Sequence, residues 1–150
     1  VRKHLESAPD DFKKKAQENK IKNALIVGHR PASEIPPYLC VADVLVLPNS
    51  AKSTISARYT SPLKLFEYMA SRRPIVASDL PSLREILDEK TATFFEPDNP
   101  QSLAEGVKFA LDNSVIATKK AEEAYLKVQN YTWDKRVGQI LSFIKLKIGN

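Results

Sequence analysis

Apolar and polar residues alternate along the chain in two different patterns. Four short, nearly continuous apolar runs are typical of strands that are buried on both faces. They lie at Asn23–Gly28, Val44–Pro48, Pro74–Ser78 and Thr91–Phe95. Around them, the spacing of apolar residues predicts helices at 9–19, 33–39, 61–70, 81–87, 100–112, 114–129 and 134–147. Because strands and helices alternate, the sequence predicts an α/β fold with a doubly wound parallel sheet of about four strands and a helical C-terminal segment.

The composition is that of a soluble, globular chain, with 43% hydrophobic and 27% charged residues. A length of 150 residues suits one domain with one core. No basic stretch leads into an apolar run of signal-peptide length, and no run approaches the roughly 18 residues that span a bilayer. The chain begins at Val1 rather than at a methionine, which suggests a piece of a longer protein.

The single cysteine and the net charge narrow the possible chemistry. Cys40 lies in the apolar run Tyr38–Ala42 without a nearby histidine, so we expect a buried structural thiol rather than a nucleophile. The net charge of +5 allows nucleic acid, anionic lipid or a phosphorylated small molecule as partner. The basic residues are spread out and not interleaved with aromatic residues, which argues against a single-strand nucleic-acid binder.

The sequence lacks the motifs of several other enzyme classes: a P-loop, G-x-G-x-x-G, H-E-x-x-H and paired cysteines. His4 and His29 are far apart, and no ligand cluster supports a metal site, so we expect neither a metal nor a cofactor. In an open parallel sheet, ligands bind beyond the carboxyl ends of the strands. The loops after Val27, Leu47 and Ser78 are therefore where we expect a site.

The predicted helix that begins at Ser61-Pro62 breaks a local rule. Ser61 is a favourable N-cap and Pro62 a favourable first residue, but Lys64 stands where a glutamate would complete a capping box. A cation there faces the positive end of the helix dipole, which costs roughly 0.3–1 kcal/mol. An anion held by the backbone N–H groups of Leu63 and Lys64 would remove this cost, so the pattern favours a phosphate site. Alternatively, Lys64 pairs with Glu67 and only solvates the surface.

Three stretches occur in a distinctive order and spacing: Tyr38–Pro48, Ser61–Ala70 and Arg73–Leu87. Together they resemble the C-terminal domain of the group 1 (family 4) retaining glycosyltransferases, and Thr132-Trp133 resembles the family's Ser/Thr-Trp before the last helix. The resemblance covers roughly residues 20–147. It implies a GT-B fold, in which a Rossmann-like domain of this kind holds the nucleotide-sugar donor and an N-terminal domain holds the acceptor.

The resemblance also implies site residues. Glu67 matches the second glutamate of the family's E-x7-E motif, which hydrogen-bonds the ribose hydroxyls of the donor. Lys64 and the N–H group of Leu63 match the groups that hold the diphosphate, so Lys64 and Glu67 are the expected catalytic pair. The loop Gly28-His29-Arg30 matches the one that borders the base. The full set of expected donor-binding residues is Gly28, His29, Arg30, Thr60, Ser61, Pro62, Leu63, Lys64 and Glu67.

Several features depart from the family pattern. Tyr59 stands where the first glutamate of E-x7-E is expected, so its role near the transferred sugar is open unless a neighbour such as Thr60 substitutes. Pro62 replaces the usual glycine, as in a subgroup with Ser-Pro-x-Lys, and Arg72 replaces the glycine before Arg-Pro. The family's Gly-rich loop and its Arg/Lys pair have no match. We therefore expect residues 1–150 to be a single nucleotide-sugar-binding domain that is truncated at its N-terminus and lacks the acceptor-binding domain.

These observations favour the donor-binding part of a glycosyltransferase that acts without a metal and is inactive as this fragment alone. The expected partners are a nucleotide-diphospho-sugar and a saccharide or lipid-linked acceptor, but not nucleic acid. Tyr59 favours the alternative of a non-catalytic nucleotide- or partner-binding module of the same fold. A third alternative, a basic nucleic-acid-binding domain, would show a steep salt dependence of binding. We expect a cytoplasmic protein, with peripheral membrane contact through the basic last helix as an open alternative.

Overall fold

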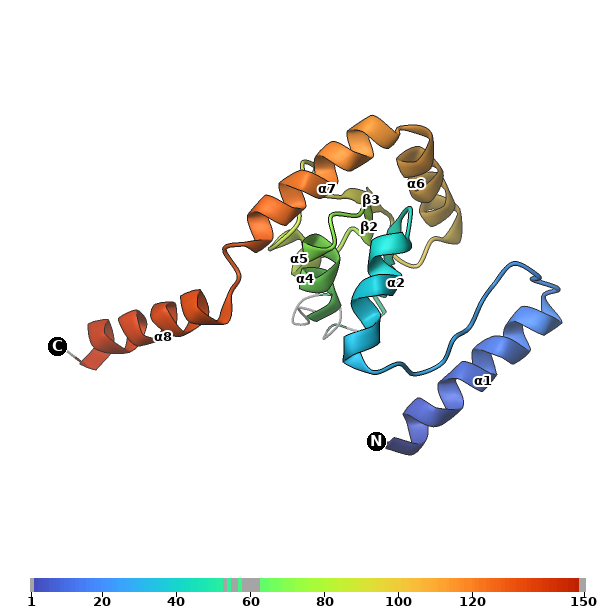
Figure 1. The fold of residues 1–150 in the computed structure, drawn as a ribbon, viewed down its shortest axis with the longest axis horizontal. Coiled ribbons are helices and arrows are strands. Elements are labelled where there is room, and N and C mark those ends of the chain that lie inside the picture. The colour runs from blue at the N-terminus through green and yellow to red at the C-terminus, as the bar shows by residue number, and fades with distance from the viewer. Residues whose placement is uncertain (1, 53, 55–56, 58–62, 149–150) are drawn as a thin grey trace. The chain divides into compact units, whose positions relative to one another are not determined.

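The computed structural model describes residues 2–52, 54, 57 and 63–148. Its elements are α1 (Arg2–Glu18), η1 (Ala32–Glu34), α2 (Ile35–Val41), β1 (Leu45–Leu47), α4 (Leu63–Ala70), β2 (Ile75–Ser78), α5 (Pro81–Arg84), β3 (Thr93–Phe95), α6 (Pro100–Asp112), α7 (Ser114–Val128) and α8 (Trp133–Ile148). The chain divides into two compact units, Val1–Ile35 and Pro36–Asn150. The sheet belongs to the second unit, where α4, α6 and α7 surround it (Figure 1).

The sheet is parallel, as the alternation of strands and helices predicts. Its three strands lie in the order β1-β2-β3, with Leu45 opposite Ile75 and Val76 opposite Thr93. Each strand lies inside one of the predicted apolar runs, and the four residues of β2 are all buried. The α/β class and the parallel sheet are therefore confirmed, with three strands among the described residues instead of about four.

The run Asn23–Gly28 is not a strand, and that prediction is wrong. The structure gives these residues no strand hydrogen bonds, and Leu25 is 87% exposed. A strand forms only where its backbone groups pair with those of a neighbouring strand. The apolar run has β propensity, but no strand of the described chain pairs with it.

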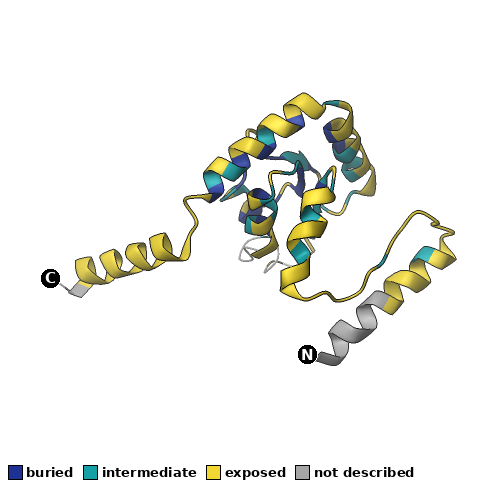
Figure 2. Ribbon diagram, viewed as in Figure 1, coloured by how far each residue is buried: buried dark blue, intermediate teal, exposed yellow. Residues whose placement is uncertain are grey.

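Helices cover both faces of the sheet, and successive residues of β2 show this directly. Ile75 and Ala77 pack in a cluster with Leu65 and Met69 of α4. Val76 points the other way, into a cluster with Ala110 of α6. Side chains of a strand alternate between faces, so one strand supplies both cores. Buried positions accordingly gather on the sheet and on the inner sides of α4, α6 and α7 (Figure 2).

The prediction that Cys40 is buried is wrong. Cys40 is exposed, whereas its neighbour Leu39 is partly buried. Consecutive residues of a helix point about 100° apart, so an apolar run on α2 cannot bury all its members against one partner. On α4, Ala70 is exposed, and the buried face consists of Leu65 and Met69, with Phe66 partly buried.

Arg72 ends the turn after α4 in a conformation that explains the family's glycine at this position. Its φ is 56°, in the left-handed region that glycine adopts freely and arginine does not. The arginine side chain makes contacts that a glycine could not. Its guanidinium lies 3.8 Å from the ring centroid of Tyr125, and its Nε lies 3.8 Å from Glu122 Oε2 on α7. These contacts tie the end of α4 to α7 and offset part of the backbone cost.

Candidate functional site

The carboxyl edge of the sheet is held together by hydrogen bonds between neighbouring strand ends. The Ser78 hydroxyl at the end of β2 donates to the Leu47 carbonyl at the end of β1, at 3.1 Å. The next backbone N–H, of Asp79, donates to the Phe95 carbonyl at the end of β3, at 2.8 Å. This is the edge beyond which parallel sheets bind ligands. The strand ends therefore form a fixed platform for the loops that follow them.

Helix α4 carries the two residues that the sequence singles out for chemistry. Its buried residues Leu65 and Met69 fix it against the core. Lys64 and Glu67 occupy the exposed side, and α4 has no acidic residue in its first turn. Within the described chain, Lys64 and Glu67 form no ion pair with each other, contrary to what the simple surface interpretation expects. Among the described residues, a cation and a carboxylate thus lie one turn apart on a firmly anchored helix without pairing with each other.

Aromatic residues support the other side of α4. The ring of Phe66 lies against Tyr131, with the centroids 5.4 Å apart. Tyr68 packs on the core, where burial and the Glu67 carboxylate raise the pKa of its hydroxyl. The hydroxyl of Ser71 donates to the Tyr68 carbonyl at 2.7 Å and closes the end of the helix. The position of Lys64 and Glu67 is therefore set by packing on several sides.

The structure describes only some of the other predicted site residues. Thr60, Ser61 and Pro62 lie outside the described residues, as does Tyr59. The predicted base loop, Gly28 to Arg30, belongs to the first unit and is exposed. Gly28 has a φ of 71°, and the Arg30 guanidinium lies 3.8 Å from the Glu34 carboxylate. Of the predicted set, the described structure places Leu63, Lys64 and Glu67 on one element.

A charged network beyond β2 was not anticipated from the sequence. Arg84 donates from Nε to Asp79 Oδ1 at 2.6 Å and from Nη2 to Asp79 Oδ2 at 3.0 Å. It also binds Glu89, and its guanidinium lies 3.6 Å from the ring centroid of Phe94. The hydrogen bond from Arg84 holds the pKa of Asp79 below its usual range, and the Asp79 carboxylate raises the pKa of Arg84. Asp79 is therefore committed to fixing this edge rather than free to act as an acid or base.

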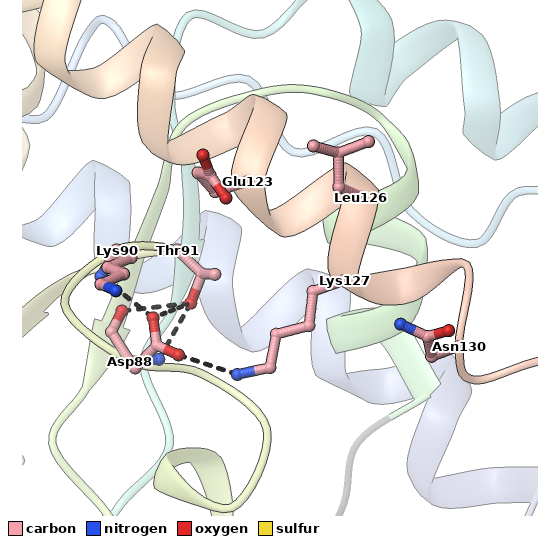
Figure 3. A pocket seen from close by; sticks show the side chains of 7 residues that line it. All are labelled: Asp88, Lys90, Thr91, Glu123, Leu126, Lys127 and Asn130. Atoms are coloured by element: carbon pink, nitrogen blue, oxygen red, sulfur yellow. Dashed lines mark hydrogen bonds and ion pairs between the residues drawn. The ribbon is translucent and has the colours of Figure 1, made fainter.

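A pocket of about 350 Å³ lies elsewhere on the domain, where the end of α7 meets the turn before β3 (Figure 3). Lys127 Nζ donates to Asp88 Oδ2 at 2.8 Å, and the Thr91 hydroxyl donates to the same carboxyl group at 3.1 Å. Two of the four charged side chains that line the pocket, Asp88 and Lys127, thus satisfy each other. Because Asp88 and Thr91 precede β3, the pocket lies at the amino edge, opposite the edge at which a ligand is expected. Its full lining is Asp88, Lys90, Thr91, Glu123, Leu126, Lys127 and Asn130.

The Asp88–Lys127 pair should make stability depend on pH in the acid range. The hydrogen bond from Lys127 is the main cause that lowers the pKa of Asp88. A carboxyl group whose folded-state pKa is depressed stabilises the fold above its unfolded-state pKa of about 3.9, and this contribution is lost as the pH falls through the folded-state pKa. We expect Asp88→Asn to lower the melting temperature at neutral pH and to match the wild type well below about pH 3.

Thermal melts between about pH 2 and pH 7 check this expectation. Asp112→Asn is the matched control, because Asp112 is exposed on α6 and makes no side-chain hydrogen bond or ion pair in the described chain. A gap between wild type and Asp88→Asn that stayed constant down to the lowest pH would show that the pair does not carry the effect.

Neither a membrane-spanning helix nor a metal-binding cluster occurs in the described part of the chain. No helix there is long and apolar enough to cross a membrane. The same residues include no cluster of three or more histidine, cysteine, aspartate or glutamate side chains placed to hold a metal ion.

Known proteins resemble this chain over most of its length. The profile of the family described as "Glycosyl transferases group 1" matches residues 5–113. A relative from Bacillus subtilis (strain 168), named as the teichuronic acid biosynthesis glycosyltransferase TuaH, is 28% identical over 81 residues. That match covers 54% of this chain and 20% of the relative.

Solved structures share the fold. HepE (Alr3699) of Anabaena, in complex with UDP, matches with a TM-score of 0.73 and 16% identity, over 89% of this chain and 36% of HepE. The C-terminal domain of LpcC, a group 1 family glycosyl transferase from Francisella tularensis, matches with a TM-score of 0.62 and 22% identity. This second match covers 81% of this chain and 60% of the LpcC chain. The chain thus spans about a fifth of TuaH and about a third of HepE.

Proposed function

We propose that this chain, which belongs to the group 1 glycosyltransferases, is the part of such an enzyme that binds the nucleotide-sugar donor. The observation that carries the proposal is the pair Lys64 and Glu67, which are exposed on an anchored helix without an acidic first turn and form no ion pair with each other. These are the residues that match the donor ligands of the family. The UDP complex of the structurally similar HepE supports a nucleoside diphosphate as the ligand.

Lys64 and Glu67 would bind two different parts of the donor, the diphosphate and the ribose. The backbone N–H groups at the start of α4 and the Lys64 ammonium would bind the diphosphate, as helix N-termini bind anions. Glu67 would accept hydrogen bonds from the ribose hydroxyls and fix the register of the nucleotide. When the sugar leaves, negative charge builds up on the diphosphate, and the same cationic groups stabilise it electrostatically. The proposed chemistry needs no metal.

The proposal assigns acceptor binding to another part of the enzyme. The chain spans about a fifth to a third of its relatives, so the domain that binds the acceptor is proposed to lie outside these residues. Sugar transfer requires both parts to close over donor and acceptor and to exclude water. We therefore expect residues 1–150 alone to bind donor poorly and to transfer no sugar.

A transfer assay of the full-length protein and of residues 1–150, with panels of UDP-sugars and GDP-sugars, tests the proposed function. We expect turnover by the full-length protein and none by the fragment. Nucleotide binding without turnover by the full-length protein would instead favour a non-catalytic module of the same fold. Binding of nucleic acid with a steep salt dependence and no nucleotide affinity would contradict both.

The exposed helix α8 suggests where the enzyme works. All its side chains from Trp133 to Lys147 are exposed (Figure 2). The helical spacing of Val137, Ile140 and Ile144 places these apolar residues along one side. The helix also carries four basic residues and one acidic residue, Asp134. A basic amphipathic helix binds the surface of an anionic membrane through both features. We propose peripheral contact of α8 with the cytoplasmic membrane surface, where nucleotide sugars are available.

Flotation with vesicles tests this placement. We expect the full-length protein to rise with vesicles that contain phosphatidylglycerol but not with pure phosphatidylcholine, and Ile140→Asp to weaken the association. Failure to float with either vesicle would contradict membrane contact by α8.

A further inference from the structure

Asp98 adopts a backbone conformation that its residue type does not favour. It lies in the turn between β3 and α6, with a φ of 59°. Aspartate tolerates this left-handed region better than most residues, but glycine is the usual occupant. Such a conformation persists where the surrounding structure over-determines it, and it is often connected with a functional site. The contacts on both sides of Asp98 are therefore informative.

The turn that carries Asp98 is itself rigid. The Asn99 side chain caps α6 by accepting from the N–H groups of Gln101 and Ser102, at 3.0 and 3.1 Å. The Ser102 hydroxyl accepts from the N–H of Glu96 at 3.0 Å, and Asn99 Nδ2 donates to Glu96 Oε2 at 2.6 Å. These bonds lock the residues on each side of Asp98. Its carboxylate is thus presented in a fixed direction.

The carboxylate reaches a segment 47 residues earlier in the chain. Asp98 Oδ2 accepts from the backbone N–H of Ala51 at 2.9 Å, and the side chain of Ser50 donates to the same carboxylate. The Ser50 hydroxyl in turn accepts from the N–H of Lys52 at 3.1 Å. These hydrogen bonds, with that from Ser50 first, hold the pKa of Asp98 below its usual range. One side chain thereby fixes the whole turn Ser50–Lys52.

This tie crosses the sheet. Ser50 follows β1 and Asp98 follows β3, and these two strands are not neighbours because β2 lies between them. The Ser78–Leu47 and Asp79–Phe95 hydrogen bonds join adjacent strand ends, whereas the Asp98 tie spans from the first strand to the third. It lies at the carboxyl edge, and the segment it holds is the one by which the chain leaves β1 for α4.

We propose that Asp98 is a positioning residue of the donor site: its tie to Ser50–Lys52 holds the chain after β1 in the arrangement that receives the nucleotide. The proposal rests on the function proposed above. A segment that is already ordered loses little conformational freedom when the ligand binds, whereas an untied segment must be ordered at the expense of affinity. Asp98 would thus act on donor affinity without touching the donor.

Asp98→Gly separates this role from a structural one. Glycine adopts the left-handed conformation more easily than aspartate, which offsets part of the stability lost with the hydrogen bonds, so the variant should stay folded and melt close to or slightly below the wild type. It cannot accept the hydrogen bonds from Ala51 and Ser50. In the full-length enzyme we expect the donor KM to rise about fivefold with little change in kcat, as for a loss of ground-state binding. Hydrogen exchange at the amides of Ala51 and Lys52 should become faster.

Two further variants act as controls. Asp98→Asn keeps a side-chain acceptor and tolerates the same backbone conformation, so it should recover most of the lost affinity. Lys20→Gly changes another non-glycine residue with positive φ, 54°, which follows α1. It should leave the donor KM and the exchange at Ala51 and Lys52 unchanged. A defect of equal size in the Asn and Gly variants would contradict the tie as its cause.

The experiment distinguishes failure of this inference from failure of the proposed function. If the wild-type enzyme uses a nucleotide-sugar donor but Asp98→Gly keeps its donor KM, Asp98 is not a positioning residue, even if exchange at Ala51 becomes faster. If the wild-type enzyme neither binds nor uses any nucleotide or nucleotide sugar, the proposed function itself is wrong, and this inference falls with it. A raised donor KM together with faster exchange at Ala51, in a variant that stays folded and recovers with Asp98→Asn, is the result that supports Asp98.

Discussion

Lys64→Glu should abolish nucleoside diphosphate binding by the full-length protein while leaving the fold intact. Lys64 is exposed on α4, so the substitution breaks no buried contact. In the wild type, the ammonium and the N–H groups of the first helical turn would meet the diphosphate together. A carboxylate at position 64 would repel the diphosphate that the ammonium attracts. The loss of a charge-assisted hydrogen bond alone is worth about 1.5–3 kcal/mol, so with the added repulsion affinity should fall by at least about a hundredfold.

The thermal shift caused by nucleotide measures this effect together with the stability of the fold. At a nucleotide concentration about 100 times Kd, binding stabilises a protein by about 2.7 kcal/mol. The wild type should therefore melt at a higher temperature with UDP or GDP, and Lys64→Glu should not respond. Without nucleotide, the variant should be equal or slightly more stable, because a glutamate in the first turn suits the helix dipole. Lys108→Glu, at an exposed position on α6, is the matched control and should keep the full shift.

Glu67→Gln should weaken nucleotide binding about tenfold or more with almost no effect on stability. Glutamine has the size and the helix propensity of glutamate, and residue 67 is exposed. A carboxylate that accepts two ribose hydroxyls makes charge-assisted hydrogen bonds, whereas the amide offers one neutral acceptor and places a donor against the second hydroxyl. The lost affinity should therefore depend on the ribose hydroxyls rather than on the phosphates.

A double-mutant-type cycle, which combines Glu67→Gln with removal of the ribose hydroxyls from the ligand, tests the role of Glu67. UDP should bind the wild type more tightly than 2′,3′-dideoxy-UDP, and Glu67→Gln should bind the two with nearly equal affinity. Glu105→Gln, which changes another exposed helix carboxylate, should keep the wild-type preference. If Glu67→Gln still prefers the ribose form as strongly as the wild type, Glu67 does not contact the ribose.

The alternative interpretation of α4 gives a different pattern. If Lys64 and Glu67 only solvate the surface, both substitutions shift stability by a few tenths of a kcal/mol and leave nucleotide binding unchanged. Lys64 and Glu67 form no ion pair with each other in the structure, which removes the pairing that this interpretation invokes. Binding data on the two variants separate the interpretations.

Much of the fold could be predicted because its signals are local. The runs that contain β1, β2 and β3 are nearly continuous apolar stretches, as is typical of strands in a parallel sheet that helices cover on both faces. Asn99 and Pro100 mark the start of α6 by ordinary capping chemistry, and the predicted bounds 100–112 are confirmed. Asn23–Gly28 has the same apolar pattern as the strands, but the pattern carries no information about a pairing partner. Cys40 was mispredicted for the same reason, because burial depends on what a helix face meets.

Some residues of the candidate site could likewise be predicted from the sequence, and others could not. Lys64 could be found from the sequence because a cation in a first helical turn violates a local preference. Asp98 could not, because its partners lie 47 residues away and its φ depends on the whole turn around it. Arg84 and Asp79 are only five residues apart, but this sequence spacing does not distinguish their hydrogen-bonded pair from an ordinary surface ion pair.

Calorimetric titration of the full-length protein with UDP and GDP tests the central claim most directly. We expect the wild type to bind at least one of these nucleotides at one site, Glu67→Gln to bind it about tenfold more weakly, and Lys64→Glu to show no measurable heat of binding. Equal affinity in all three proteins would contradict the assignment of the donor site to α4.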